Sequence, residues 1–354
     1  MSIQKFISGS TTLAKIGSSN DLKNLFPESL LNSETIIIKP NWVSTDPADF
    51  TDASTLEMLF RALDSRIVII ESYILARSLN LSPHGLSFRI GEREVDWKWL
   101  LKGDGWNWLI ENPDWEWFKN GPHWEHIRLE DQEFLDRYGF SELFERFNVT
   151  YLNVTEEVWN ARNADPALVK RVVDSRYGPL KFDELYRVLP AALYNLRGAT
   201  LISLARLKMY ASYTIKNFFG LIPDPLRPWW HGPQGDRIVD SILDMNKLYH
   251  AFFKIYGICE AIYTSAFIAP DGKHDGIYCG RYNVTDGSGV IAMGPDLVSL
   301  DAFLLDMADP EFIWIADLNR DCIARAAKDF GVELNHLPPG SLPEVRGWFL
   351  PSLD

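Results

Sequence analysis

The chain has few cysteines. Three occur in 354 residues, Cys259, Cys279 and Cys322, and no two of them form a CxxC pair. Their spacing to histidines is not typical of a zinc site either. We therefore expect reduced thiols and no bound metal. With 46% hydrophobic residues, a chain of this length can bury one large core or two modest ones without disulfides.

Long apolar runs are also missing. No stretch approaches the roughly eighteen consecutive apolar residues that a membrane-spanning helix requires. The first residues, Met-Ser-Ile-Gln-Lys, lack the apolar run of a secretory signal. We therefore expect a cytoplasmic protein without a membrane partner.

Positive charge is in deficit, because the formal net charge is -13. Binding to nucleic acid relies on a clustered excess of Lys and Arg that neutralises phosphates. We therefore expect no nucleic-acid partner. The chain also contains no Gly-x-Gly-x-x-Gly, Walker or Gly-x-Ser-x-Gly motif, so nicotinamide binding, P-loop nucleotide hydrolysis and serine hydrolysis lack their usual sequence support.

What the sequence does contain is a strand–helix–strand pattern near its start. Residues 35–40 form a short β-branched run that ends in Lys39 and Pro40, and residues 66–71 form a second such run. A helical pattern begins at Ser54 between them. Runs of this kind are typical of strands buried on both faces, and their order predicts a right-handed parallel crossover.

The same alternation returns later in the chain. We predict a helix over 141–147, strands over 149–154 and 199–207, and a long amphipathic helix over 237–256. The fold class is therefore α/β, a mostly parallel sheet flanked by helices. Its core is predicted from 1–77 and 141–330, with 331–354 as a C-terminal tail.

Residues 78–140 interrupt this core with a tryptophan-rich insertion. Trp97, Trp106, Trp115 and Trp124 recur every nine residues, and turn-forming residues lie between them. We interpret this pattern as three or four short antiparallel strands that carry their tryptophans on one face. Packing into a small core is favoured over an exposed aromatic platform for a ligand or a partner.

Several lysines follow buried strands. Lys39 and Lys208 end strand patterns, and Lys216 lies on the helix expected after the second of them, with His231 further along. Open α/β sheets bind ligands at the carboxyl ends of their strands, so these four residues are the candidate catalytic groups. Together they would form a positive pocket for a carboxylate or phosphate, unless each lysine pairs with a nearby acid instead.

A desolvated lysine has a lowered pKa and can act as a base. The candidate substrate-binding residues lie close to these lysines or to His231 in the sequence, except for one aspartate that could face the lysines as an acid partner. They are Asn41, Asn217, Trp229, Trp230 and Asp296. Asp296 has a second interpretation, since it could cap the helix that begins near Leu297. The Asp271 to Gly276 loop holds two carboxylates and a histidine, but turn chemistry explains it better than a metal does.

The chain resembles domain of unknown function family 362. The resemblance rests on Lys39-Pro40-Asn41, on Lys216-Asn217-Phe218-Phe219-Gly220, and on Gly294-Pro295-Asp296 followed by Asp301-Ala302. It implies an α/β fold distantly like the amino-terminal region of nickel-pincer lactate racemase. The ferredoxin-like cysteines that many relatives append are absent here, so we expect no iron–sulfur cluster. Gly280 to Gly289 matches the family's glycine-rich loop poorly.

Two hypotheses about function follow. The first is an isomerase- or lyase-type enzyme, with a biosynthetic role as one option, that binds a small anionic or planar metabolite and moves a proton at carbon. The second is a non-catalytic ligand-binding or assembly protein that docks partners through the tryptophan-rich insertion. The cofactor is left unknown, and the oligomeric state is left open with a homo-oligomer as one option.

Overall fold

The structure is a computed structural model of the chain. It describes residues 3–46, 49–78, 87–90, 93–96, 104–111, 123–208, 213–223, 227–268, 271, 273–276, 280–286, 289–307 and 316–334.

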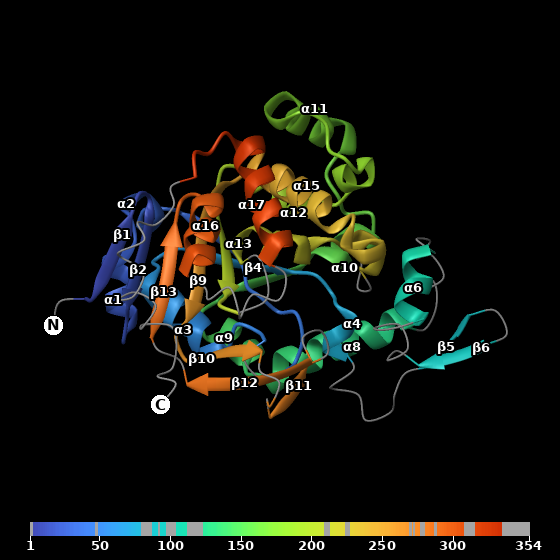
Figure 1. The fold of residues 1–354 in the computed structure, drawn as a ribbon, viewed down its shortest axis with the longest axis horizontal. Helices are drawn as coiled ribbons and strands as arrows, with labels where there is room; N and C mark the ends of the chain where they lie inside the picture. Colours follow the sequence, from blue (N-terminus) through green and yellow to red (C-terminus); the bar gives the residue numbers. More distant parts are fainter. Residues whose placement is uncertain are drawn as a thin grey trace.

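An eight-stranded sheet runs through the centre of the molecule (Figure 1). Strands β9, β8, β3, β4 and β7 are parallel to one another, while β13, β2 and β1 continue the sheet antiparallel. This confirms the predicted α/β fold with a mostly parallel sheet. In spatial order the strands are β1 (Lys5–Ser8), β2 (Thr11–Lys15), β13 (Val290–Gly294), β9 (Lys254–Ala261), β8 (Thr200–Arg206), β3 (Thr35–Lys39), β4 (Arg66–Glu71) and β7 (Thr150–Asn153).

Helices cover both faces of the sheet, because alternate strand residues point to opposite sides. Ile36 and Ile38 of β3 pack with one helix layer, and Ile37 packs with the other. The first layer holds α1 (Ser19–Leu25), α2 (Glu28–Leu31), α3 (Ala53–Ala62), α8 (His123–Arg137) and α9 (Phe140–Arg146). The second holds α10 (Val154–Trp159), α11 (Pro166–Tyr177), α12 (Ala191–Tyr194), α13 (Thr214–Asn217), α14 (Pro228–His231), α15 (Ile238–His250), α16 (Leu297–Met307) and α17 (Ala316–Phe330).

The side on which the chain adds its next parallel strand changes between β3 and β8. From β3 it moves through α3 to the neighbouring strand β4, on one face. From β8 it moves through α13 and α15 to β9, the neighbour on the opposite side, and these helices lie on the other face. The gap between the carboxyl ends of β3 and β8 is therefore a topological switch point, where open α/β sheets bind their ligands.

Short elements complete the described structure. They are α4 (Leu75–Ser78), α6 (Asp104–Glu111), the 3-10 turns η1 (Asp183–Arg187), η2 (Phe218–Leu221) and η3 (Pro233–Gly235), the β5 (Ser87–Ile90) and β6 (Arg93–Asp96) hairpin, and a small sheet of β10 (Thr264–Ile268), β12 (Gly280–Asp286) and β11 (His274–Gly276). Of the helices in the described ranges, none is long and apolar enough to cross a membrane.

The prediction of one helix over 237–256 is wrong at its end. Helix α15 stops at His250, and β9 begins at Lys254. Ile255, assigned to the apolar face of that helix, instead pairs with Leu201 of β8. Apolar residues at the end of a helix and at the start of a fully buried strand form one continuous pattern, so periodicity alone does not separate them.

The prediction of antiparallel strands through the tryptophan repeat is also wrong where the structure describes it. The insertion contains one antiparallel pair, β5 and β6, but Trp106 and Trp108 lie on α6 and Trp124 lies on α8. Leu109 and Ile110 are buried, three and four residues after Trp106, which is the spacing of a helical face. Trp97, Trp99, Trp115 and Trp117 lie outside the described residues.

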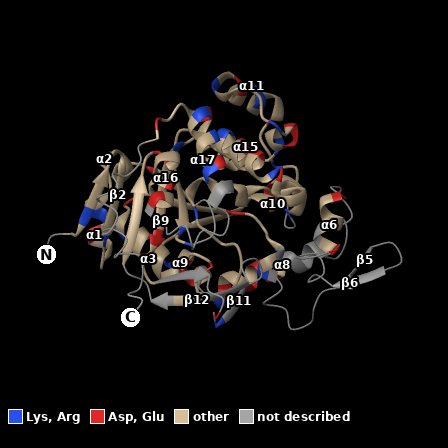
Figure 2. Cartoon of the chain, in the orientation of Figure 1, with Lys and Arg blue, Asp and Glu red and all other residues tan. Residues whose placement is uncertain are grey.

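Charged side chains of both signs lie on the outer helices, as Figure 2 shows for α11 and α17. Lys170 and Asp174 of α11 are 3.5 Å apart, and Lys247 of α15 pairs with Asp329 of α17 at 2.7 Å. Ion pairs at or near the surface contribute little to stability. Several of the charged groups that are buried instead lie at the carboxyl ends of the parallel strands.

Candidate active site

Each parallel strand carries a buried polar residue at or next to its carboxyl end. These residues are Lys39 on β3, Glu71 on β4, Asn153 on β7, Arg206 on β8 and Glu260 on β9. Parallel strands bring their carboxyl ends to one edge of a sheet, so the five side chains share that edge. Buried polar groups are costly unless they are paired. Asn153 contacts Asp131 of α8, and the other four residues belong to two networks that also hold candidate residues.

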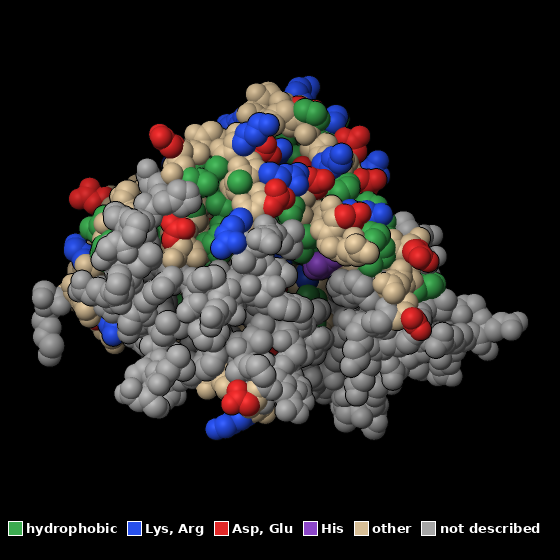
Figure 3. All heavy atoms as spheres, viewed as in Figure 1, with side chains coloured by type: hydrophobic (Ala, Val, Ile, Leu, Met, Phe, Trp, Pro, Cys, Tyr) green, Lys and Arg blue, Asp and Glu red, His purple; other side chains and the backbone are tan. Residues whose placement is uncertain are grey.

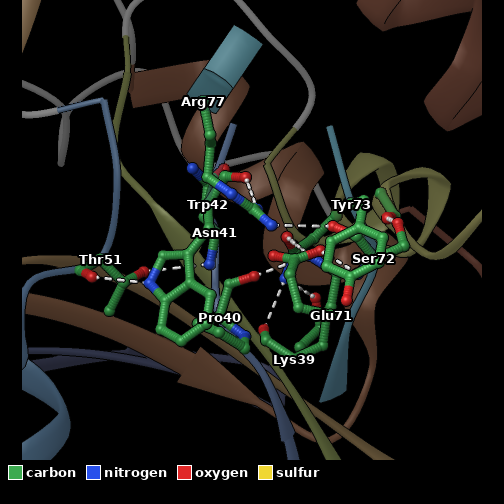
Figure 4. A network of polar contacts seen from close by, with 12 residues as sticks. Lys39, Pro40, Asn41, Trp42, Thr51, Glu71, Ser72, Tyr73 and Arg77 are labelled. Carbon is green, nitrogen blue, oxygen red and sulfur yellow. Dashed lines mark hydrogen bonds and ion pairs between the residues drawn. The ribbon is translucent and has the colours of Figure 1, made fainter. Parts of the chain in front are cut away.

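The first network contains Lys39, Glu71, Ser72, Asn217 and Arg227, and we call it the Lys39 network. Lys39 and Glu71 are each only 2% exposed. The Lys39 Nζ donates to Glu71 Oε2 at 2.9 Å, to the Pro40 carbonyl at 2.7 Å and to Asn217 Oδ1 at 3.4 Å. Figure 4 shows the Lys39 and Glu71 side chains pointing toward each other from neighbouring strands.

Lys39 is poised to lose its proton. The pKa of Lys39 is lowered to about 8, because burial and, to a smaller extent, the nearby Arg227 and Arg77 guanidinium groups outweigh the opposing effect of Glu71. Desolvation disfavours the charged form of any amine, whereas a carboxylate favours it. A sizeable fraction of Lys39 is therefore neutral near physiological pH.

Asn217 joins the two strands that flank the switch point. Its amide nitrogen donates to the Lys39 carbonyl of β3 at 2.8 Å and to Ser203 Oγ of β8 at 3.2 Å. Ser203 Oγ in turn donates to the Thr214 carbonyl at the start of α13 at 2.8 Å. Asn217 thus fixes α13 against Lys39.

Arg227 closes the network from the opposite side. Its guanidinium donates to the Gly220 carbonyl at 2.7 Å, to the Tyr73 carbonyl at 3.3 Å and to Ser72 Oγ. The Arg227 backbone has a φ of 47° directly before Pro228. A left-handed conformation is unfavourable for a non-glycine residue and costs about 1–3 kcal/mol, and such strain often marks a functional site.

Gly220 is the closest cover over Lys39. A Cβ atom on Gly220 would lie 2.9 Å from Lys39 Nζ and 3.7 Å from Glu71 Oε1. The residue is half-buried, and a methyl group there would force the end of the Lys39 side chain to shift, because the backbone passes close to the ion pair.

Lys216 and His231 are half-buried beside this network. His231 Nδ1 donates to the Arg227 carbonyl at 3.0 Å. The imidazole ring packs edge-on against the Phe219 ring, and the two ring centroids are 5.0 Å apart. Burial, together with the charges of Lys216 and Arg227, lowers the pKa of His231 to about 4, although the hydrogen bond to the Arg227 carbonyl opposes this change. Because a carbonyl only accepts, Nδ1 carries the hydrogen and the lone pair is on Nε2. Figure 3 shows a histidine next to a basic side chain near the middle of one face.

The second network contains Asp49, Asp52, Arg206, Lys208 and Glu260, and we call it the Arg206 network. Lys208 Nζ donates to the Asp49 carbonyl at 2.6 Å and pairs with the Asp49 carboxylate. Arg206 lies 3.2 Å from Asp52 and 3.3 Å from Glu260. Asn41 reaches this network as well, because its amide donates to the Asp49 carbonyl at 3.0 Å.

Three further candidates make structural contacts. Asp296 caps α16, since it accepts from the Val298 amide at 2.9 Å and from Ser299 Oγ at 2.6 Å. Trp229 and Trp230 pack against Phe182, with ring centroids 5.8 and 5.6 Å away. The contacts of Asp296 are therefore those of a helix cap, which was the second interpretation of this residue.

The structure thus separates the sequence-based candidates into groups. Lys39 and Asn217 are in contact, Lys216 and His231 lie beside them, and Lys208 and Asn41 belong to the other network. Asp271 is exposed, and no cluster of three or more potential metal-ligating side chains occurs among the residues that the structure describes.

Sequence reasoning missed Glu71, Arg77 and Arg227. Glu71 follows four buried β-branched or apolar residues, so its position at a strand end was a usable signal. Arg77 of α4 donates to the Trp42 carbonyl at 2.8 Å and to the Ser72 carbonyl at 3.1 Å, and it pairs with Asp131 of α8. Neither arginine has a sequence pattern that identifies it.

Part of the tryptophan-rich insertion adjoins this site. Helix α6 packs against α14, the short helix that carries Trp229, Trp230 and His231. The insertion is therefore next to a helix of the candidate site rather than remote from it.

The fold and site define an α/β protein with a buried ionic site at the switch point of its sheet. No protein-family model, curated protein or solved structure matches the chain. The resemblance to domain of unknown function family 362 therefore stays a prediction that rests on its motifs, and the functional argument rests on the geometry of the site.

Proposed function

We propose that the protein is an isomerase- or lyase-type enzyme that binds a small anionic metabolite at the switch point and moves a proton at carbon. The observation that carries the proposal is Lys39, a buried lysine with a pKa lowered to about 8, paired with Glu71 at the end of β3. Perturbed groups at ligand-binding positions are candidates for catalysis.

Neutral Lys39 is suited to act as the base. A neutral amine has two N–H groups and one lone pair, so Lys39 can keep its two shorter hydrogen bonds, to Pro40 O and Glu71 Oε2, and give up the weak contact of 3.4 Å with Asn217. The lone pair takes a proton from carbon, and the electron pair moves into an adjacent carbonyl or carboxylate. Return of the proton gives an isomer, and loss of a neighbouring leaving group gives a lyase product.

The charge around Lys39 favours an anion. Lys216 and Arg227 both add positive potential near His231, and the half-buried positions of Lys216 and His231 suit contacts with a bound molecule. A carboxylate placed there would be attracted by these charges and would stabilise the protonated form of Lys39 as the proton moves. The neighbouring α6 would form one wall, which supports a partly aromatic or planar substrate.

Deuterium exchange tests the reaction class without knowledge of the product. The protein is incubated in D2O with a panel of hydroxy, oxo and amino acids that have a C–H bond next to the carboxylate. We expect at least one acid to gain deuterium at carbon, and Lys39→Met to abolish the gain. Lys247→Met is the matched control, because Lys247 pairs with Asp329 between two outer helices.

A second measurement separates catalysis from binding alone. Native mass spectrometry of protein purified from its own host reports a retained anion, and Lys216→Ala should release it. A bound anion without deuterium exchange in any acid of the panel would contradict the enzyme and favour the ligand-binding alternative. Exchange that persists in Lys39→Met would remove Lys39 from the reaction.

A further inference from the structure

Asp301 holds the start of the helix that carries two candidate site residues. It lies on α16, is 0% exposed, and accepts from the Thr214 amide at 2.8 Å, from Thr214 Oγ at 2.6 Å and from the Ile215 amide at 2.9 Å. The first amides of a helix have no partner within the helix. A carboxylate from another helix therefore supplies the acceptors for α13.

The contacts of α13 continue to Lys39. Lys216 lies one residue after Ile215, and Asn217 follows and donates to the Lys39 carbonyl at 2.8 Å. The Thr214 carbonyl accepts from Ser203, which also contacts Asn217. Asn217 is the last residue of this single-turn helix, so its position against Lys39 depends on where Asp301 and Ser203 hold the first residue, Thr214.

We propose that Asp301 is a positioning residue, which holds α13 so that Asn217 and Lys216 stand correctly against Lys39. The inference rests on the proposed function and adds to it a residue that touches neither substrate nor Lys39.

The cost of burying this carboxylate supports the assignment. Burial raises the pKa of Asp301 to about 6, although its hydrogen bonds to Thr214 and Ile215 oppose the rise. A carboxyl group whose pKa is higher in the folded than in the unfolded protein favours folding at low pH, and that stability is lost as the pH rises through about 6. The ionised carboxylate therefore lowers the stability of the fold at neutral pH.

Nearby titratable groups do not compensate this charge. Tyr213, Cys259 of β9 and Cys322 of α17 each feel the charge of Asp301, and burial raises the pKa of all three. They are neutral when Asp301 is ionised, so the hydrogen bonds to α13 are its main compensation. A costly buried group that fixes one helix fits a positioning role better than a stabilising one.

Asp301→Asn tests the proposal against a closely matched control. Asp244 of α15 is also buried, burial also raises its pKa to about 6, and it accepts from the Phe182 amide at 2.9 Å rather than from α13. As the pH rises through about 6, the free energy of unfolding should fall less in Asp301→Asn and in Asp244→Asn than in the wild type. Hydrogen exchange of a peptide covering residues 213–222 should increase about tenfold in Asp301→Asn and stay unchanged in Asp244→Asn.

The second readout is the pKa of Lys39, followed by NMR of lysine labelled at Cε. Displacement of α13 admits water, so the Lys39 pKa should rise by about one unit or more in Asp301→Asn, a tenfold change in proton affinity, and not in Asp244→Asn. A merely structural role would not change this pKa in the folded protein. If Asp301→Asn does not fold, Thr214→Val removes one of the three hydrogen bonds and should give a smaller shift of the same sign.

The outcomes separate this inference from the proposed function. A wild-type Lys39 pKa near the ordinary value contradicts the proposed function, whatever the variants do. Unchanged exchange and an unchanged Lys39 pKa in the folded Asp301→Asn protein, or equal changes in Asp244→Asn, overturn the positioning role.

Discussion

The two buried networks at the carboxyl edge of the sheet differ in the sign of their charge. The Lys39 network holds two cations, Lys39 and Arg227, and one carboxylate, Glu71, which pairs with Lys39. In the Arg206 network Arg206 and Lys208 meet three carboxylates, Asp49, Asp52 and Glu260. The same edge therefore has a positive site at β3 and β4 and a negative one at β8 and β9, and an anion is expected at the first.

The networks also differ in the type of cation at their centre, which is a lysine in the Lys39 network and an arginine in the Arg206 network. A guanidinium stays charged at any physiological pH, whereas a buried lysine readily changes its pKa. Asp52 accepts from the Thr55 amide at 2.7 Å as the cap of α3, and Asp49 holds the Asn41 loop. The Arg206 network therefore braces the loops beside the site, and the Lys39 network can exchange a proton.

The largest expected effect comes from removing the single carboxylate of the Lys39 network. Glu71→Gln leaves Lys39 buried without its anion, which should lower the free energy of unfolding by about 3–5 kcal/mol at pH 7. Denaturant unfolding measures this loss. The double variant Lys39→Met with Glu71→Gln should recover most of it, and a double variant as unstable as Glu71→Gln would contradict the pairing.

The pH dependence of stability sharpens the contrast. The folded pKa of Lys39, about 8, lies below its unfolded value of 10.5, so the unfolded protein binds more protons between them. The stability of the wild type should therefore rise between these pH values, by on the order of 3 kcal/mol from this group. Lys39→Met should lack that part of the rise, and equal slopes in the two proteins would mean that Lys39 titrates normally.

A methyl group at Gly220 tests the close approach over Lys39. Gly220→Ala places a Cβ 2.9 Å from the Lys39 Nζ, which should cost about 1–3 kcal/mol in the free energy of unfolding. Gly17→Ala is the control, because its Cβ would be 3.8 Å from the nearest atom, Asp21 Oδ2. Equal unfolding midpoints for the two variants would show that Gly220 does not confine Lys39.

The smallest effect is expected in the Arg206 network. Burial raises the pKa of Glu260, which shows that its charged form is disfavoured at this position. Arg206 also keeps Asp52 as a partner. Glu260→Gln should therefore cost about 1 kcal/mol, well below Glu71→Gln under the same denaturation conditions. A loss as large as that of Glu71→Gln would erase the distinction between the networks.

Strands β3, β4, β7 and β8 were predicted because each is a short, largely apolar run, whereas β1, β2, β9 and β13 were not predicted. The run Thr-Ile-Ile-Ile-Lys of β3 is β-branched and too short for a typical helix, which favours a strand. The boundary between α15 and β9 was not predictable, since the apolar pattern continues through it. The helices of the insertion were missed because the two tryptophans of a Trp-x-Trp unit have the two-residue period of a strand. That match extends over only a few residues, which is too short to exclude a helix.

The candidate site was predictable only in part. Lys39 stood out because it ends a strand pattern, and Asn217 because it adjoins Lys216 on the helix expected after a later strand. The fold brings the two residues together. The contact between Lys39 and Glu71 joins residues 32 positions apart and depends on strand register, which one sequence does not determine. The assignment of Lys208 to a different network depends in the same way on the loop that carries Asp49.

The pKa of Lys39 in the folded protein tests the central claim most directly. NMR of lysine labelled at Cε, with Lys39→Met to assign the signal, follows its titration in the intact chain. The account predicts a pKa of about 8. A pKa near the ordinary value of 10.5 would contradict it, because Lys39 would then be a permanently charged partner of Glu71 and would not serve as a base.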